Sequence, residues 1–142
     1  MLRIVSANLN GIRSAHSYGF FSWLEQDMPD IVCVQELKAQ AADMSAALLK
    51  PAGYQGFFLY SEKKGYSGVG IYCRQPPDRI VEGIGHPEFD AEGRFLRADF
   101  GALTVISVYV PSGSSSPERQ IAKFAFLDEF FPILDRLIKE GR

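Results

Sequence analysis

The chain has 142 residues, 46% of them hydrophobic and 13% aromatic, which is enough apolar material for one globular domain and excludes a disordered chain. The formal net charge of −2 excludes a protein that coats nucleic acid through bulk positive charge, but not one with a local basic face. No apolar run approaches the length that spans a bilayer, and the N-terminus lacks a signal-peptide layout, so we expect a cytoplasmic protein with no membrane partner.

The first part of the chain alternates strand-like and helix-like segments. In chain order we predict a strand at 2–9, a loop at 10–19, a helix at 20–28, a strand at 31–36 and a helix at 40–49. Pro29 ends the first helix, and the alanine and leucine residues of the second favour a helix there. The second strand, IVCVQ, reads as buried and ends directly before Glu36, which raises the question of what this carboxylate meets.

The later strands follow one another directly. We predict them at 56–60, 69–73, 94–100 and 103–110, with turns rich in glycine or proline between them. A long helix comes last, because Ser115 or Ser116 can cap it and Pro117 suits its first turn. Its apolar residues recur every three or four positions and form one stripe: Ile121, Phe124, Leu127, Phe131, Leu134 and Ile138. Pro132 is expected to kink this helix or to split it in two.

These elements predict an α/β fold with a mixed sheet and helices on its outer face. No internal repeat, low-complexity tract or linker interrupts the chain. Cys33 and Cys73 lie in apolar, strand-like stretches without a CxxC pair or a nearby histidine. We therefore predict two buried free thiols in a reducing compartment.

Polar residues stand at the ends of the first two predicted strands. Because a helix joins these strands, they can be parallel neighbours, and their carboxyl ends then meet at one edge of the sheet. Asn8 and Glu36 would lie side by side there, and a carboxamide oxygen with one carboxylate suits Mg²⁺ better than zinc. Plainer alternatives stay open: Asn-Gly is a common turn, and Glu36 can be a solvated strand end or a partner of Lys38.

Other segments carry groups that suit a phosphodiester. Lys63 and Lys64 precede a Gly-Tyr-Ser-Gly turn, which is either a charged hairpin tip or a loop that approaches a phosphate backbone. Arg94 and Arg97 alternate with apolar residues, so one arginine can face solvent or substrate. Tyr109 ends a buried strand before a serine-rich loop, where its hydroxyl either is satisfied in the core or hydrogen-bonds a phosphate oxygen.

Five stretches, taken together and in order, resemble the exodeoxyribonuclease III family of abasic-site endonucleases, within the endonuclease/exonuclease/phosphatase superfamily. They are SANLNGIRSA, DIVCVQELKA, GYSGVGIY, EGRFLRADF and VISVYVPSGSSSPERQ. The resemblance covers nearly the whole chain and implies a two-sheet α/β sandwich with helices outside. It implies hydrolysis of duplex DNA 5′ to abasic sites, with related 3′→5′ exonuclease and 3′-end-cleaning activities. The implied cofactor is Mg²⁺, with Mn²⁺ as a substitute.

The resemblance also implies roles for individual residues. Glu36 matches the family's metal-binding glutamate, Asn8 its asparagine near the metal and the scissile phosphate, and Tyr109 its phosphate-contacting tyrosine. Segments that flank the DNA groove contain five more residues: Arg13, Lys38, Tyr66, Gly68 and Arg94. Such a site would stabilise the charge of the transition state through the metal and through donors such as Tyr109 and Asn8.

The chain departs from the family in what it lacks. Family members continue with a Gly-Asp-x-Asn motif and later carry an Asp-His pair, which supply the base and further metal ligands. No Asp-x-Asn occurs here, and neither His16 nor His86 follows an aspartate, so we expect both to be surface or loop residues. We expect residues 1–142 to be the N-terminal half of the domain, one sheet whose apolar inner face packs on a second sheet outside the chain.

Three interpretations follow from the sequence. The first is an abasic-site endonuclease of which this chain supplies part of the active site and is inactive by itself. The second is a truncated, non-catalytic module that binds DNA or a partner. The third keeps the superfamily but takes another phosphodiester or a phosphoinositide as substrate, and the GIRSA and PSGSSSPERQ stretches favour DNA repair over it.

Overall fold

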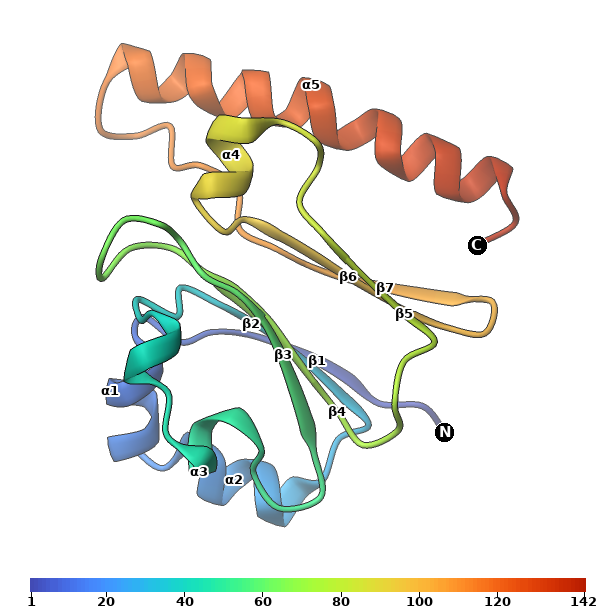
Figure 1. The fold of residues 1–142 in the computed structure, drawn as a ribbon. Coiled ribbons are helices and arrows are strands. Elements are labelled where there is room, and N and C mark those ends of the chain that lie inside the picture. Colours follow the sequence, from blue (N-terminus) through green and yellow to red (C-terminus); the bar gives the residue numbers. More distant parts are fainter.

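The computed structural model describes residues 1–142 as a sandwich of four layers, with helices on the outer face of each of two packed sheets (Figure 1). The first sheet has the strand order β1-β2-β4-β3: β1 (Ile4–Asn8), β2 (Ile31–Gln35), β4 (Val69–Cys73) and β3 (Gln55–Leu59). The second sheet has the order β5-β6-β7: β5 (Arg79–Glu82), β6 (Phe95–Phe100) and β7 (Leu103–Val108). The mixed α/β architecture predicted from the sequence is confirmed.

The helices divide between the two outer faces. The first sheet is covered by α1 (Ile12–Ser17), α2 (Phe20–Asp27) and α3 (Ala46–Leu49), with a 3₁₀ turn at Ala41–Asp43. The second sheet is covered by α4 (Pro87–Ala91) and α5 (Pro117–Lys139). None of these helices combines the length and the apolar character needed to cross a bilayer.

The pairing of β1 with β2 is parallel, as the intervening helix predicts, and every other strand pair is antiparallel. The register runs from Ile4 opposite Ile31 to Asn8 opposite Gln35. Both strands therefore end at the same edge of the first sheet. Glu36 is the next residue after β2, so it emerges beside the end of β1.

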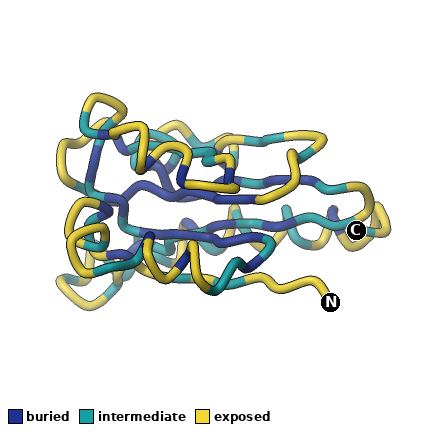
Figure 2. The backbone as a smooth tube through the Cα atoms, turned by 90° about the horizontal axis from the view of Figure 1, so that it is seen from below, coloured by how far each residue is buried: buried dark blue, intermediate teal, exposed yellow.

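Strand β2 is buried along its whole length because it faces a hydrophobic cluster on each side. Val32 and Val34 point outward to the cluster under α1 and α2, which also contains Leu24. Ile31 and Cys33 point inward to the cluster between the two sheets. Figure 2 shows the buried residues gathered in the middle of the molecule and the exposed ones mainly around its outside. Because both faces of the strand are covered, its residues are apolar at successive positions, which explains the continuous apolar run in the sequence.

The expectation of a single sheet with an uncovered inner face is wrong. The chain builds both sheets, and Leu96, Ala98 and Val105 of the second pack against Ile71 and Cys33 of the first. Of the later strands, β3 and β4 extend the first sheet, whereas β6 and β7 pair antiparallel with each other and with β5 in a separate sheet, where the sequence had suggested a single one. Strand β5 and helix α4 were missed because each is only four or five residues long.

Two local predictions in the first part of the chain also need correction. Residues 10–19 contain α1, because Ile12 is fully buried and the Ala15 N–H donates to the Gly11 carbonyl at 2.9 Å. The helix expected at 40–49 is broken into the 3₁₀ turn and α3. A reciprocal cap between Gln40 and Asp43 closes the first turn, and Met44 is extended.

Helix α5 (Pro117–Lys139) is one helix through Pro132, so of the two expected outcomes, a kink or a split, the split does not occur. Ser116 caps the helix as predicted, since its hydroxyl oxygen accepts from the Arg119 N–H at 3.2 Å. Pro132 lies on the exposed side, where water can satisfy the Asp128 carbonyl that proline leaves without a donor.

The predicted apolar stripe of α5 is not the face that packs on the second sheet. Phe126 and Leu137 are buried instead, and Phe130 packs against Phe95. Four members of the stripe are between 54% and 70% exposed: Ile121, Phe124, Phe131 and Ile138. A three-stranded sheet is narrow, so it covers only a narrow face of the helix.

The two cysteines are free and buried, as predicted, and burial raises the pKa of each thiol to about 11. We expect the thiol reagent DTNB at pH 8 to label neither Cys33 nor Cys73 in the native protein and both after unfolding, because a buried thiol rarely forms the reactive thiolate. Absorbance of the released thiolate at 412 nm measures this labelling. Fast labelling of either cysteine in the folded chain would contradict the inner core described above.

Pro132→Ala is expected to raise the free energy of unfolding by about 1–3 kcal/mol, because alanine restores an N–H to the Asp128 carbonyl and favours the helix. Urea unfolding followed by circular dichroism measures the change. Ala125→Pro at another exposed position of α5 is the control and should lower the free energy by about 3 kcal/mol or more. A lower free energy of unfolding in Pro132→Ala would contradict this expectation, because it would mean that proline stabilises the helix at this position.

Candidate functional site

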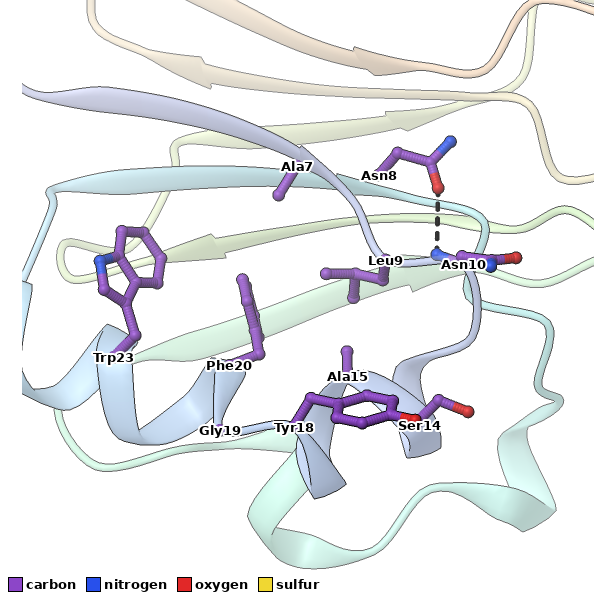
Figure 3. Close-up of a pocket in the computed structure, with 10 residues that line it drawn as sticks. All are labelled: Ala7, Asn8, Leu9, Asn10, Ser14, Ala15, Tyr18, Gly19, Phe20 and Trp23. Carbon is purple, nitrogen blue, oxygen red and sulfur yellow. Dashed lines mark hydrogen bonds between the residues drawn. The ribbon is translucent and has the colours of Figure 1, made fainter.

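Asn8 and Glu36 meet where β1 and β2 end. The Asn8 side-chain N–H donates to Glu36 Oε1 at 3.0 Å, so the two groups lie side by side as the strand order predicts. The orientation of Asn8 differs from the prediction, because its amide oxygen accepts from the Asn10 backbone N–H at 3.0 Å (Figure 3). In this structure Asn8 positions the carboxylate of Glu36 through its nitrogen and does not present its oxygen to a cation.

The backbone around this pair is strained. Four non-glycine residues have positive φ angles of 46° to 52°: Asn10, Glu36, Lys38 and Ser67. Each such residue costs on the order of 1–3 kcal/mol, and such outliers concentrate at functional sites. Backbone hydrogen bonds hold the conformation: Gly11 N–H donates to the Glu36 carbonyl at 2.8 Å, and Lys38 N–H to the Ser67 carbonyl at 2.9 Å.

Lys38 provides a cation next to the carboxylate. Its ammonium nitrogen lies 3.4 Å from Glu36 Oε2 and donates to Asn10 Oδ1 at 2.5 Å. The ion pair between Glu36 and Lys38, one of the plainer alternatives from the sequence, is therefore present. It does not compete with the site, because Glu36 also faces Asn8 and Tyr109.

The environment of Glu36 favours its ionised form. The hydrogen bond from Asn8 is the main cause that lowers the pKa of Glu36, helped by the hydroxyl of Tyr109 and by Lys38, against a smaller opposing effect of burial. Burial, and then the negative charge of Glu36, raise the pKa of Tyr109 to about 12. At neutral pH the pair is thus a carboxylate and a neutral phenol beside it.

Tyr109 follows β7 and is held by Arg94 at the start of β6. The Tyr109 N–H donates to the Arg94 carbonyl at 2.8 Å, and the Arg94 guanidinium donates back to the Tyr109 carbonyl at 3.1 Å. The guanidinium also lies 5.3 Å from the centre of the Tyr109 ring. Arg94 is only 1% exposed, so it lies under the site and not on the DNA-facing surface where the family resemblance had put it.

The other candidate residues lie around this centre. Arg13 is exposed and donates to the Lys38 carbonyl at 3.3 Å. The Tyr66 hydroxyl accepts from Arg94 at 2.8 Å. Gly68 has a φ of 88°, and a Cβ at this position would lie 3.1 Å from the Leu37 side chain. The lack of a side chain at Gly68 therefore lets its backbone pack closely against Leu37.

Sequence reasoning missed three residues of this site. Arg119, in the first turn of α5, donates to the Tyr66 hydroxyl at 3.3 Å, which joins the helix to the loop before β4. Glu92 forms an ion pair with Arg94, and Asn10 accepts from Lys38. The spacing of two between Glu92 and Arg94 was a signal that could have found that pair.

A cavity of about 620 Å³ lies beside Asn8, between the free edge of β1 and helices α1 and α2 (Figure 3). Its lining residues combine amides with exposed aromatic side chains: Ala7, Asn8, Leu9, Asn10, Ser14, Ala15, Tyr18, Gly19, Phe20 and Trp23. No group of three or more His, Cys, Asp or Glu side chains that could hold a metal ion occurs in the chain. A metal at this edge would therefore take one carboxylate, Glu36, from these residues.

Comparison with known proteins gives the family of the chain. The endonuclease/exonuclease/phosphatase family matches residues 5–140. The chain belongs to that family. It is 35% identical over 119 residues to an exodeoxyribonuclease of Bacillus subtilis, a match that covers 83% of this chain and 46% of that protein. It is 30% identical to a DNA-(apurinic or apyrimidinic site) endonuclease of Dictyostelium discoideum, over 80% of this chain and 31% of that protein.

A solved structure supports the same family. An AP endonuclease from Archaeoglobus fulgidus superposes with a TM-score of 0.81 at 32% sequence identity, over 96% of this chain and 52% of that one. The resemblance to the exodeoxyribonuclease III branch of the endonuclease/exonuclease/phosphatase family is thus confirmed. The chain spans about half the length of the solved relative and less than half of the two curated ones.

The causes of the low Glu36 pKa give a ranked prediction. Asn8→Ala is expected to raise the pKa of Glu36 more than Tyr109→Phe does, because the Asn8 hydrogen bond is the larger cause. Carboxyl-carbon NMR shifts followed over pH measure both values. Equal effects, or a fall in either variant, would contradict the geometry of the site.

The same shift sets the sign of a pH effect on stability. Because the pKa of Glu36 is lower in the folded than in the unfolded chain, its stabilisation is present above the ordinary value of 4.5 and is lost as the pH falls through the folded value. Asn8→Ala removes the main cause of this low pKa. The free energy of unfolding should therefore fall less in the variant than in the unmodified chain when the pH is lowered below 4.5.

Proposed function

We propose that this chain is part of a metal-dependent DNA-repair phosphodiesterase that hydrolyses duplex DNA 5′ to abasic sites. Exonuclease action from the 3′ end and removal of blocked 3′ ends belong to the same proposal. The observation that supports it most directly is the meeting of Glu36, Asn8 and Tyr109 at one edge of a fold shared with an AP endonuclease. Polar groups from three strand ends, at a strained and partly exposed edge, suit a charged phosphodiester.

The residues present fit a hard divalent cation in a limited way. Glu36 is held ionised and partly exposed, and Mg²⁺ commonly takes only one or two carboxylates beside waters and substrate phosphate. Glu36 would hold the ion, with Asn8 keeping the carboxylate in place, and Mn²⁺ would be a substitute. When bound, such an ion neutralises phosphate charge and stabilises the leaving oxygen.

The chain's own residues would bind and orient the phosphodiester. Tyr109 stays a neutral phenol at physiological pH, so it can donate to an anionic oxygen that shares the position beside Glu36. Arg13 and Lys38 place positive charge at the exposed rim, where phosphate contacts fix the register of DNA. Extruding an abasic nucleotide costs less than extruding an intact one, because it lacks base stacking.

Neither histidine forms a hydrogen bond with Asn8, Glu36 or Tyr109, so we propose no base for water from this chain. His16 packs against Phe21 and His86 against Phe89. We propose that residues 1–142 are the N-terminal part of one domain and that the base and further metal ligands come from a second part of the same domain. The edge strands of the two sheets, β1 and β3 in the first and β5 and β7 in the second, are places where such a part could extend them.

The missing base also favours a second candidate function. A chain that holds Glu36 and the rim cations without a base would bind abasic DNA and leave it intact. This non-catalytic module differs from the first proposal in one measurable respect, which is turnover.

The test measures incision of a fluorescent abasic duplex in Mg²⁺ by two proteins. One is residues 1–142, and the other is a longer protein that continues after residue 142 to the full length of the relatives. We expect no turnover by residues 1–142 and Mg²⁺-dependent incision by the longer protein. Glu36→Ala in the longer protein should lower the rate by more than the roughly 10- to 100-fold typical of groups that only support a metal ligand.

Glu88→Ala, an exposed carboxylate on α4, is the matched control and should leave the rate unchanged. Clear incision by residues 1–142 alone would overturn the account of the missing base. Unchanged incision by Glu36→Ala would remove Glu36 from the site, and binding without incision by both proteins would favour the non-catalytic module.

A further inference from the structure

Arg94 is the largest of the fully buried side chains, and burying a charge is costly unless the charge is paired and hydrogen-bonded. Its pairing is nearly complete. The Nε–H donates to Glu92 Oε2 at 2.5 Å, and a second nitrogen forms an ion pair with the same carboxylate. The remaining donors reach the Tyr109 carbonyl at 3.1 Å and the Tyr66 hydroxyl at 2.8 Å. Each of the three guanidinium nitrogens thus has a protein partner, and the side chain is almost fully buried, so it is not presented to a DNA phosphate.

The same guanidinium lies between two aromatic rings. Its central carbon is 5.3 Å from the centre of the Tyr109 ring and 5.7 Å from that of Tyr66. The planar fork of arginine can stack on rings and donate along its edges at once, which the ammonium group of lysine cannot do. Both the backbone and the ring of Tyr109 are thereby fixed by one side chain.

The contacts run from Glu92 through Arg94 to Tyr109, whose hydroxyl in turn helps to lower the pKa of Glu36, the proposed metal-binding carboxylate. We propose that Arg94 is a positioning residue, which sets the Tyr109 ring against Glu36 and does not touch DNA. The inference rests on the proposed function only in taking Glu36 as a cation ligand.

Tyr66 extends this assembly to the surface. Its hydroxyl also accepts from Arg119, and the Lys63 ammonium lies 4.8 Å from its ring centre. These two cations, unlike Arg94, are placed where a phosphate backbone could reach them. Arg94 therefore joins the surface that would meet DNA to the edge that would hold the cation.

The test compares Arg94→Lys with two matched variants on the purified chain. Arg97→Lys is the structural control, because Arg97 lies in β6, which begins directly after Arg94, and forms a largely buried ion pair with Asp99. Lys63→Met removes a cation placed to contact phosphate. Two quantities are measured: Mn²⁺ affinity by electron paramagnetic resonance, and the salt dependence of binding to a duplex with a tetrahydrofuran abasic analogue.

We expect Arg94→Lys to weaken Mn²⁺ binding by about 10-fold, as loss of an outer-shell partner does, and to leave the slope of log affinity against log salt unchanged. Lys63→Met should reduce that slope by about one and keep the Mn²⁺ affinity. Arg97→Lys should change neither. A reduced slope with unchanged Mn²⁺ affinity in Arg94→Lys would overturn the proposal and make Arg94 a phosphate contact.

The Tyr109 ring gives a readout that needs no ligand. Nuclear Overhauser cross-peaks from this ring to the Glu36 side chain should weaken at least about two-fold in Arg94→Lys and in Tyr66→Phe, and persist in Arg97→Lys. Tyr66→Phe removes only a hydroxyl, so it tests the idea even if Arg94→Lys does not fold. Absent Mn²⁺ binding by the unmodified chain would count against the proposed function, whereas unchanged cross-peaks would count against the positioning role of Arg94.

Discussion

The site depends on the parallel pairing of β1 with β2. Side chains alternate along a strand, so a slip of one residue would turn Asn8 to the opposite face and break its hydrogen bond to Glu36. The register is fixed by packing, because β2 sends Val32 and Val34 into one hydrophobic cluster and Ile31 and Cys33 into the other. The two cores therefore determine how accurately the polar ends of the strands meet.

Sequence periodicity was enough to predict every strand except β5, and also the adjacency of Asn8 and Glu36, since a helix between two strands favours their parallel pairing. It could not predict that β5, β6 and β7 form a sheet of their own, because long-range packing determines which strands pair. The positive φ angles of Glu36 and Lys38 carry no local signal either, as glycine or asparagine would have. The direction in which Asn8 turns its oxygen depends on the Asn10 N–H, which becomes visible only in three dimensions.

Arg94, directly before β6, and Arg97, within β6, share one sequence pattern but form ion pairs at two different ends of the molecule. Each lies two residues from an acidic partner, Glu92 for Arg94 and Asp99 for Arg97, and residues two apart share a face in extended chain. Because the arginines are an odd number of residues apart, they point to opposite faces. One pair supports Tyr109, and the other binds Arg142 after α5 and ties that helix to the β6–β7 hairpin.

The exposed ridge of isoleucine and phenylalanine along α5 has a practical consequence for handling the protein. Water-excluding salts such as ammonium sulfate strengthen the attraction between such ridges on different molecules, so they should bring the protein out of solution early. Low-salt buffers are thus the natural conditions for keeping the protein in solution, and it should bind a hydrophobic-interaction column at a low concentration of such a salt.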